Sequence, residues 1–336
     1  MSDSLGVRFT AGVLRVERRG AAIFERAYGA VDAVGGSSVF VDTRFDIASL
    51  TKLFTSALAL RYVQEGRVSL DALLTDIIPE WRKTAHRIIT LRMLLAHTSG
   101  MQSGADYRTL LDDAIVRYAL MRTLTATPGE RVVYSDLGFI ALGVLLERLS
   151  GASLAEMIHR YAALAGAKTA AYRPSAAEIP AIPATEEDGW RGRVRGAVHD
   201  EKAYLMNGVA GHAGLFATAS DVAHLTEAFL GPLCGRSATL VALPFVRESV
   251  LEQGRDAVLR RGLGWALKTS DENSCGALMS RSTFGHTGFT GTCVWADPER
   301  DVQIVLLTNA VYYGRSDLRS VRAAVCDAVI QELDAC

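Results

Sequence analysis

Sequence patterns typical of β-strands lie near both ends of this 336-residue chain. Residues 12–29 interleave aliphatic and charged side chains around one Arg-Gly turn, which predicts an antiparallel hairpin. Strand patterns return only late, in residues 262–268, 289–297 and 301–310. Because a sheet needs strands that lie side by side, the two ends must meet in space. The pattern therefore predicts an α+β fold whose antiparallel sheet is built from both chain ends.

Between these strands the apolar spacing is helical. Residues 49–64 carry apolar side chains three and four positions apart, which predicts a half-buried helix. Residues 70–165 are mostly helical in pattern, including 114–120 and 137–148, and show no strand pair. A last helix is expected over residues 318–333. Helices should therefore flank the sheet and form the inserted region.

A proline-containing stretch over residues 172–199 reads as a long irregular connection. It suggests a division into two parts. Residues 1–65 and 200–336 are expected to form an α/β sheet domain, and residues 66–199 a mainly helical domain. The active site is expected in the cleft between them.

Composition excludes several classes of protein. Apolar residues make up 49% and charged residues 22%, as in ordinary globular proteins, and the net charge of -1 offers no attraction for nucleic acid or an anionic membrane. The most apolar run, 137–146, is too short to span a bilayer. Five cysteines without C-x-x-C spacing indicate reduced thiols. Residues 1–12 contain no signal-like apolar stretch, so we expect a cytoplasmic protein.

The first candidate for chemistry is Ser49, followed three positions later by Lys52. Residues three apart share one face of a helix, so the two side chains can touch. Only five lysines occur in the chain, and 22 serines, so chance predicts roughly 0.3 such pairs. A desolvated lysine can act as a base, whereas arginine cannot. A serine at a helix start also brings its own N–H to a place that stabilises negative charge. A capping serine followed by a surface lysine is the structural alternative.

The second candidate is Tyr134-Ser135-Asp136, at the start of the apolar helix. Tyr134 can act as a general acid or base if a cation such as the Lys52 ammonium lowers its pKa. The alternative is a capping Asp136 beside a half-buried ring.

The third candidate is the glycine-rich segment 284–292, which contains His286, Thr287, Gly288 and Phe289. Its glycines would let a ligand approach the backbone closely. The alternative is a bulged edge strand with a surface histidine.

Other polar and aromatic residues are interpreted as structural. His97 is expected to fix the turn after a helix over residues 91–96, and His212 to lie in a turn under the cleft. The neighbours His199, Asp200 and Glu201 lack a second cluster with ligand spacing, so no metal is expected. Trp190 and Trp265 could line an acyl pocket, but buried core is the expected role of both.

Together the three motifs resemble those of the serine β-lactamase and penicillin-binding protein superfamily. An S-x-x-K serine, a Y-x-N element and a K-T-G-type strand occur there in the same order and rough spacing. Segments such as LLAHTSGM and GVAGHAGLFATASDVAHL are similar to the class C-like branch, and the likeness covers nearly the whole chain. That branch includes β-lactamases, family VIII carboxylesterases, D-amino-acid peptidases and acyltransferases.

The resemblance implies Ser49 as nucleophile, Lys52 as its base and Tyr134 as the proton shuttle to the leaving group. It also implies an oxyanion hole formed by the N–H groups of Ser49 and Phe289. Asp136 stands where the family usually has an amide, so it could pair with Lys52 or attract a cationic amine.

His286, Thr287 and Gly288 would contact the substrate. His286 stands where β-lactamases place a lysine that binds the substrate carboxylate, which argues against β-lactam turnover. Esterases and acyltransferases of this branch tolerate histidine there.

The expected function is acyl transfer through an acyl-Ser49 intermediate, without a cofactor. The partners are a small-molecule ester or amide donor and an acceptor that is water, an amine or an alcohol. A cytosolic esterase or a biosynthetic transacylase is favoured. A β-lactamase or D-amino-acid peptidase is one alternative, and a non-catalytic relative that only binds peptide or drug is another.

Overall fold

The two ends of the chain meet in one sheet, as the strand patterns predict. The computed structural model describes residues 4–33, 35–104, 108, 110, 113–256 and 259–335. Its main sheet has eight strands in the order β2-β1-β13-β12-β11-β10-β9-β8, and every neighbouring pair is antiparallel. The strands are β1 (Ala11–Arg18), β2 (Ala21–Gly29), β8 (Gly254–Arg255), β9 (Arg260–Arg261), β10 (Ala266–Leu267), β11 (Phe284–Thr287), β12 (Cys293–Asp297) and β13 (Val302–Thr308).

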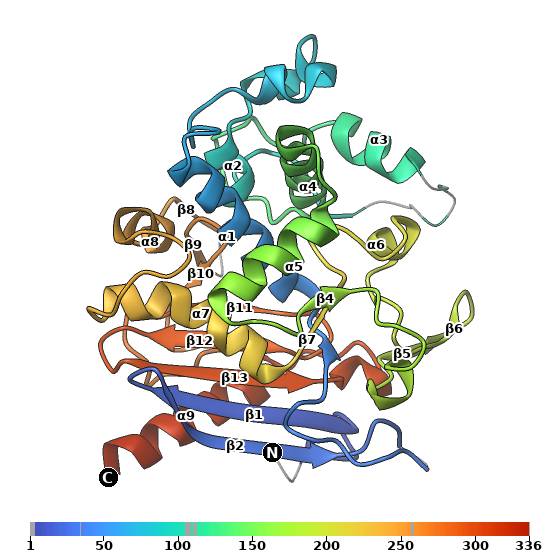
Figure 1. Ribbon diagram of the computed structural model, residues 1–336, viewed down its shortest axis with the longest axis vertical. Helices are drawn as coiled ribbons and strands as arrows, with labels where there is room; N and C mark the ends of the chain where they lie inside the picture. Colours follow the sequence, from blue (N-terminus) through green and yellow to red (C-terminus); the bar gives the residue numbers. More distant parts are fainter. Residues whose placement is uncertain are drawn as a thin grey trace.

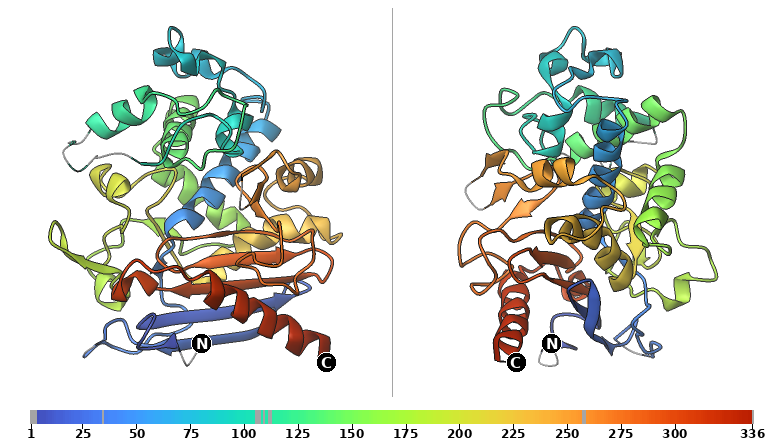
Figure 2. Two further views of the ribbon diagram at one scale, coloured as in Figure 1. Left: turned by 180° about the vertical axis from the view of Figure 1, so that it is seen from behind. Right: turned by 60° about the vertical axis from the view of Figure 1, so that its left-hand side comes forward.

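Pairing of β1 with β13 joins the N-terminal hairpin to the C-terminal strands (Figure 1). Alternate residues of β13 face opposite layers, because successive side chains of a strand point to opposite faces. Val305 and Leu307 belong to the main core, whereas Ile304 and Leu306 belong to a second core with α9 (Arg319–Ala335). Helix α7 (Ala219–Leu233) packs on the first face, and α9 crosses the other (Figure 2).

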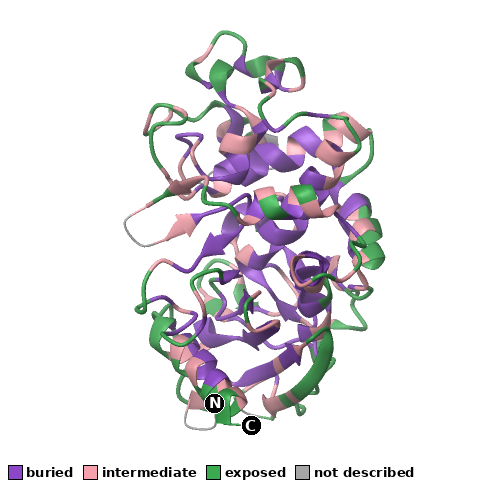
Figure 3. Cartoon of the chain, turned by 90° about the vertical axis from the view of Figure 1, so that its left-hand side faces the viewer, coloured by how far each residue is buried: buried purple, intermediate pink, exposed green. Residues whose placement is uncertain are grey.

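The middle of the chain supplies most of the helices, which lie above the sheet in Figure 1. They are α1 (Thr51–Gln64), α2 (Leu91–Leu95), α3 (Asp113–Met121), α4 (Asp136–Ser150), α5 (Leu154–Ala165), α6 (Glu201–Leu205) and α8 (Leu243–Val250). The prediction of a half-buried α1 is wrong: eleven of its fourteen residues are buried, because α4 and α5 pack against it. Figure 3 shows that the interior of the molecule is mostly buried, with exposed residues at its periphery. In the described part of residues 70–165 the only β-pairing is one isolated antiparallel bridge, Leu73–Thr90, so no strand pair forms, as predicted.

Residues 172–199 are less irregular than predicted. They contain a small hairpin of β5 (Glu186–Asp188) and β6 (Gly192–Val194). The second small sheet consists of β3 (Phe45–Asp46), β7 (Leu215–Ala217) and β4 (Ala171–Tyr172). Strand β3 leads directly into the segment that carries Ser49.

The predicted late strands are shorter in the structure. Glycines explain two of the differences: residues 262–264 turn between β9 and β10, and Gly291, at φ 113°, turns the chain before β12. Within the described residues no single helix has the length and apolar content to cross a membrane, although the bent pair α4 and α5 together meets those two criteria.

Candidate active site

Ser49 lies in a short 3-10 turn, Ala48–Leu50, between β3 and α1. The preceding residue, Ala48, has φ 46°, a left-handed conformation that is unusual for a residue with a side chain. Asp46 Oδ1 accepts a hydrogen bond from Ala48 N at 2.8 Å, which holds this turn in place. Two threonine hydroxyls clamp it further: Thr290 Oγ1 donates to Asp46 O at 2.8 Å, and Thr292 Oγ1 to Ile47 O at 3.1 Å.

Lys52 lies one helical turn after Ser49 and is fully buried. Its Nζ donates to Ser49 Oγ at 3.0 Å, to Asp136 Oδ1 at 2.8 Å and to His212 O at 3.1 Å. Three acceptors match the three protons of an ammonium group. Burial disfavours that charge, but the Asp136 carboxylate outweighs burial and raises the pKa of Lys52. Lys52 is therefore an ammonium in the resting protein.

Tyr134 is placed over Lys52 by the start of α4. Ser135, not Asp136, caps this helix, because its Oγ accepts from Gly138 N at 2.8 Å. Ser135 N donates to His97 Nδ1 at 3.0 Å, and the Tyr134 ring lies 4.5 Å from the His97 ring between centroids. Lys52 Nζ is 4.9 Å from the Tyr134 ring centroid. His97 thus forms the predicted turn after α2, with φ 59°, and also supports Tyr134.

Asp136 pairs with Lys52, the first of its two expected roles. Burial alone would favour its neutral form, but the neighbouring cations lower the pKa of Asp136. The carboxylate is therefore ionised, and both its oxygens contact lysines, since Oδ2 lies 3.2 Å from Lys202 Nζ. Both of its oxygens are thus engaged in ion pairs.

The glycine-rich segment forms β11 and the turn after it. A Cβ on Gly288 would lie 2.0 Å from Thr292 Oγ1 and 2.6 Å from Ile47 O, so only glycine lets this turn approach the segment that holds Ser49. His286 is buried, and burial together with the nearby cations lowers its pKa to about 3. It is neutral at pH 7, as expected, and cannot supply the charge of the lysine that it replaces.

A cavity of about 430 Å³ opens beside Ser49. Six of the eight predicted site residues line it: Ser49, Tyr134, His286, Thr287, Gly288 and Phe289. Lys52 and Asp136 do not line the cavity, but Lys52 contacts Ser49, and Asp136 contacts Lys52. Phe289 is 57% exposed at the rim. The structure therefore gathers all three motifs at one place. A larger apolar cavity, about 640 Å³, lies between α9 and the β1–β2 hairpin and contains none of these residues.

Two arginines that the sequence analysis did not identify also line the cavity. Arg261 of β9 and Arg322 of α9 are only 7% and 8% exposed. Arg322 Nη2 donates to Gly288 O at 2.7 Å, and the Arg261 guanidinium lies 5.1 Å from the Tyr134 ring centroid. Within the described residues the Nε of each arginine has no hydrogen-bond acceptor. No local motif marks them, because each comes from a segment remote from Ser49.

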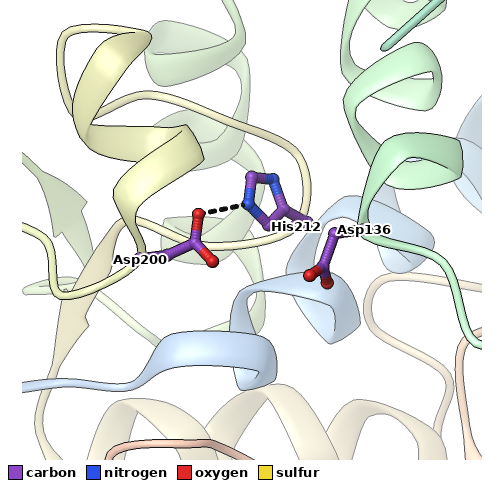
Figure 4. A group of neighbouring side chains, drawn as sticks. All are labelled: Asp136, Asp200 and His212. Atoms are coloured by element: carbon purple, nitrogen blue, oxygen red, sulfur yellow. Dashed lines mark hydrogen bonds and ion pairs between the residues drawn. The ribbon is translucent and has the colours of Figure 1, made fainter. Parts of the chain in front are cut away.

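Asp200 and His212 lie beside Asp136, within the distance that a shared metal ion would require (Figure 4). His212 Nε2 is 2.7 Å from Asp200 Oδ1. However, the ammonium of Lys202 lies 3.2 Å from Asp136 Oδ2 and 3.2 Å from Asp200 Oδ2. A lysine thus supplies the positive charge between these carboxylates, and the group is an ion-pair network.

The neighbours His199, Asp200 and Glu201 have different partners. His199 Nε2 is 2.9 Å from Glu186 Oε2, and Glu201 pairs with Arg108 and Arg315, whereas Asp200 pairs with His212 and Lys202. They do not converge on a common point.

Of the two tryptophans, Trp265 is buried in the core, as expected. The expectation for Trp190 is wrong, because it is 40% exposed beside the small β5–β6 hairpin and contacts Tyr204 edge-on at 5.3 Å. Neither lines the cavity at Ser49.

Comparison with known proteins identifies the family and the fold. The family model described as Beta-lactamase matches residues 6–326. A putative D-alanyl-D-alanine carboxypeptidase of Escherichia coli (strain K12) is 27% identical, with 92% of this chain and 80% of the relative covered. An N-acetylmuramyl-L-alanine amidase of Bacillus subtilis (strain 168) is 30% identical, with 90% and 77% covered.

Among solved structures, EstCE1, a hydrolase with promiscuous acyltransferase activity, superimposes with a TM-score of 0.77 at 20% identity, over 96% of this chain and 94% of that one. This likeness shows the shared β-lactamase/transpeptidase fold. With the family match extending over nearly its whole length, the chain belongs to the beta-lactamase family of serine hydrolases.

Proposed function

We propose that the protein is an acyltransferase or hydrolase that forms an acyl-enzyme on Ser49 from a small ester or amide. The observation that carries the proposal is the 3.0 Å hydrogen bond between Lys52 Nζ and Ser49 Oγ at the wall of the cavity. A paired nucleophile and proton-transfer group within hydrogen-bond reach is the arrangement that covalent catalysis needs.

The proton that Lys52 carries in the resting protein determines the order of the steps. With Lys52 an ammonium, the Lys52–Tyr134 pair must first lose one proton. It then accepts the Ser49 proton as Oγ bonds to the carbonyl carbon. The bond to the leaving group breaks, and Tyr134, which faces the cavity, delivers the proton to the departing oxygen or nitrogen. Water, an amine or an alcohol reverses these transfers and regenerates the Ser49 hydroxyl.

The N–H groups of Ser49 and Phe289 are proposed to bind the oxyanion. Both residues line the same cavity, and Ser49 is held in a turn fixed by Asp46. Donors fixed before the reaction stabilise developing charge without the cost of reorganising them.

Intact-protein mass spectrometry tests the proposal. After mixing with an activated ester, the unaltered protein and Ser56→Ala should gain the mass of one acyl group, and Ser49→Ala should not. Ser56 is a matched control because it is a buried serine of the adjoining helix α1. A millimolar primary amine then separates the two activities: amide product indicates a transacylase, and acid alone indicates a hydrolase. Equal product formation by Ser49→Ala would refute the proposal.

The second proposal is that the donor carries a carboxylate. The cavity is lined by Arg261 and Arg322, each buried and each with an Nε lacking an acceptor among the described residues. A guanidinium binds a carboxylate through charge-assisted hydrogen bonds. These arginines could replace the missing lysine at His286, which favours the peptidase alternative as well as an acidic ester. The relatives described as carboxypeptidases are consistent with it.

Arg261→Gln should therefore lower kcat/KM about tenfold to a hundredfold for a carboxylate-bearing ester. For the same ester with an amide in place of its carboxylate, the loss should be at most a few-fold. Arg247→Gln, an exposed change on α8, is the control and should alter neither value. Equal losses on both esters would contradict the proposed carboxylate contact.

A further inference from the structure

A second lysine, Lys202, lies behind the proposed catalytic residues. It belongs to the short helix α6, and its side chain is 6% exposed. Its Nζ contacts two carboxylates, Asp136 Oδ2 and Asp200 Oδ2, each at 3.2 Å. The other oxygen of Asp136 accepts from Lys52 at 2.8 Å. One carboxylate is therefore shared by two buried ammonium groups.

The charged groups around Lys52 and Lys202 come from several elements. Helix α1 contributes Lys52, α4 contributes Asp136, and Asp200 and Lys202 lie at the start of α6. Other titratable groups near these residues include Tyr134, His212, His97, His286 and Arg261, and Asp46 faces Asp200. Both His97 and His286 have lowered pKa values, because burial and nearby cations disfavour their charged forms. The charge of the network is therefore set by its lysines and carboxylates.

We propose that Lys202 is a positioning residue that draws part of the Asp136 charge away from Lys52 and so lowers the proton affinity of the Lys52–Tyr134 pair. This inference rests on the proposed function, since it concerns the activation of Ser49. Asp136 alone would hold the Lys52 proton tightly. When the Lys52–Tyr134 pair gives up its proton, Asp136 still has Lys202 as an ion-pair partner. Loss of that proton is therefore less unfavourable than it would be without Lys202.

The sign of the effect follows from Coulomb's law. Lys202→Met removes a positive charge close to the pair, so its proton becomes harder to remove. The rising limb of the pH–rate profile should move to higher pH by on the order of one unit. Lys202→Arg keeps the charge and should move the limb little. Asp200→Asn removes a negative charge from the same network and should move the limb to lower pH.

The rate of Ser49 phosphonylation by a fluorophosphonate measures this limb without knowledge of the natural substrate. In that step the Oγ–P bond forms, the P–F bond breaks, and fluoride leaves with the Ser49 proton taken up by the Lys52–Tyr134 pair. Rates are followed by intact mass between pH 6 and 11.5 for the unaltered protein and the three variants, so that the plateau above the rising limb is sampled as well as the limb itself. Circular dichroism identifies any variant that fails to fold, and the two remaining variants still test the sign.

Opposite shifts for Lys202→Met and Asp200→Asn, with Lys202→Arg near the unaltered protein, are the expected result. A merely structural role would slow labelling at all pH values without moving the limb. Unshifted profiles in the folded variants would overturn the inference and leave the proposed function intact. If Ser49 in the unaltered protein is not labelled at any pH, the proposed function fails, and this inference fails with it.

Discussion

Lys52→Met is expected to lower kcat/KM for any ester substrate about a thousandfold or more. The substitution removes the group that donates to Ser49 Oγ, and it leaves Asp136 with Lys202 as its remaining lysine partner. Without Lys52, the amine that hydrogen-bonds to the Ser49 hydroxyl and shares its proton is lost. Steady-state kinetics at several pH values measures the loss, with Lys83→Met, the same change at an exposed lysine, as the control.

Lys52→Arg tests whether Lys52 acts as a fixed positive charge or transfers a proton. Arginine retains the positive charge beside Asp136 but does not release a proton in proteins. If Lys52 transfers a proton, Lys52→Arg should be nearly as inactive as Lys52→Met. Activity close to that of the unaltered protein would instead show that Lys52 serves only as a fixed cation, and the proton would have to pass through Tyr134 alone.

The sequence identifies the parts of the site that are local. Ser49 and Lys52 share a helix turn, and the motifs of Tyr134 and His286 can be recognised from a few neighbouring residues. The structure adds what depends on tertiary contacts: Lys202, Arg261 and Arg322 reach the site from distant segments and lie in no recognisable motif. The sequence offers an ion pair between Lys52 and Asp136 only as one of two roles for Asp136, because the distance between two residues 84 positions apart depends on the fold.

The same distinction holds for the fold. Interleaved aliphatic and charged residues predict the long strands β1 and β2, and a nearly continuous apolar run predicts β13, which is buried on both faces. Strands β8, β9 and β10 have two residues each and show no period. The spacing of apolar residues underestimates the burial of α1, because polar residues of this helix find hydrogen-bond partners in the interior. Thr55 Oγ1, for example, donates to Gly211 O at 2.8 Å. The amino-acid composition also gives no indication that Trp190 is exposed.

Asn309→Leu is expected to lower the free energy of unfolding by about 3 to 5 kcal/mol. Asn309 is buried where the two chain ends meet, and its side chain makes four hydrogen bonds. Oδ1 accepts from Thr10 N and Ala11 N at 3.1 and 3.0 Å, and Nδ2 donates to Thr10 Oγ1 and Ala184 O at 2.8 and 2.7 Å. Leucine would leave two backbone N–H groups and a carbonyl buried without these partners. Urea unfolding followed by circular dichroism measures the change.

Thr10→Val provides a graded comparison, because it removes only the hydroxyl that accepts from Asn309 Nδ2. Its cost should be about 1 kcal/mol, well below that of Asn309→Leu. The difference matters for the architecture: Asn309 connects the residues just before and at the start of β1 to the segment that follows β13, so the join between the chain ends depends on more than the β1–β13 ladder. A loss below 1 kcal/mol for Asn309→Leu would mean that this ladder and the apolar layers on either side suffice to hold the ends together.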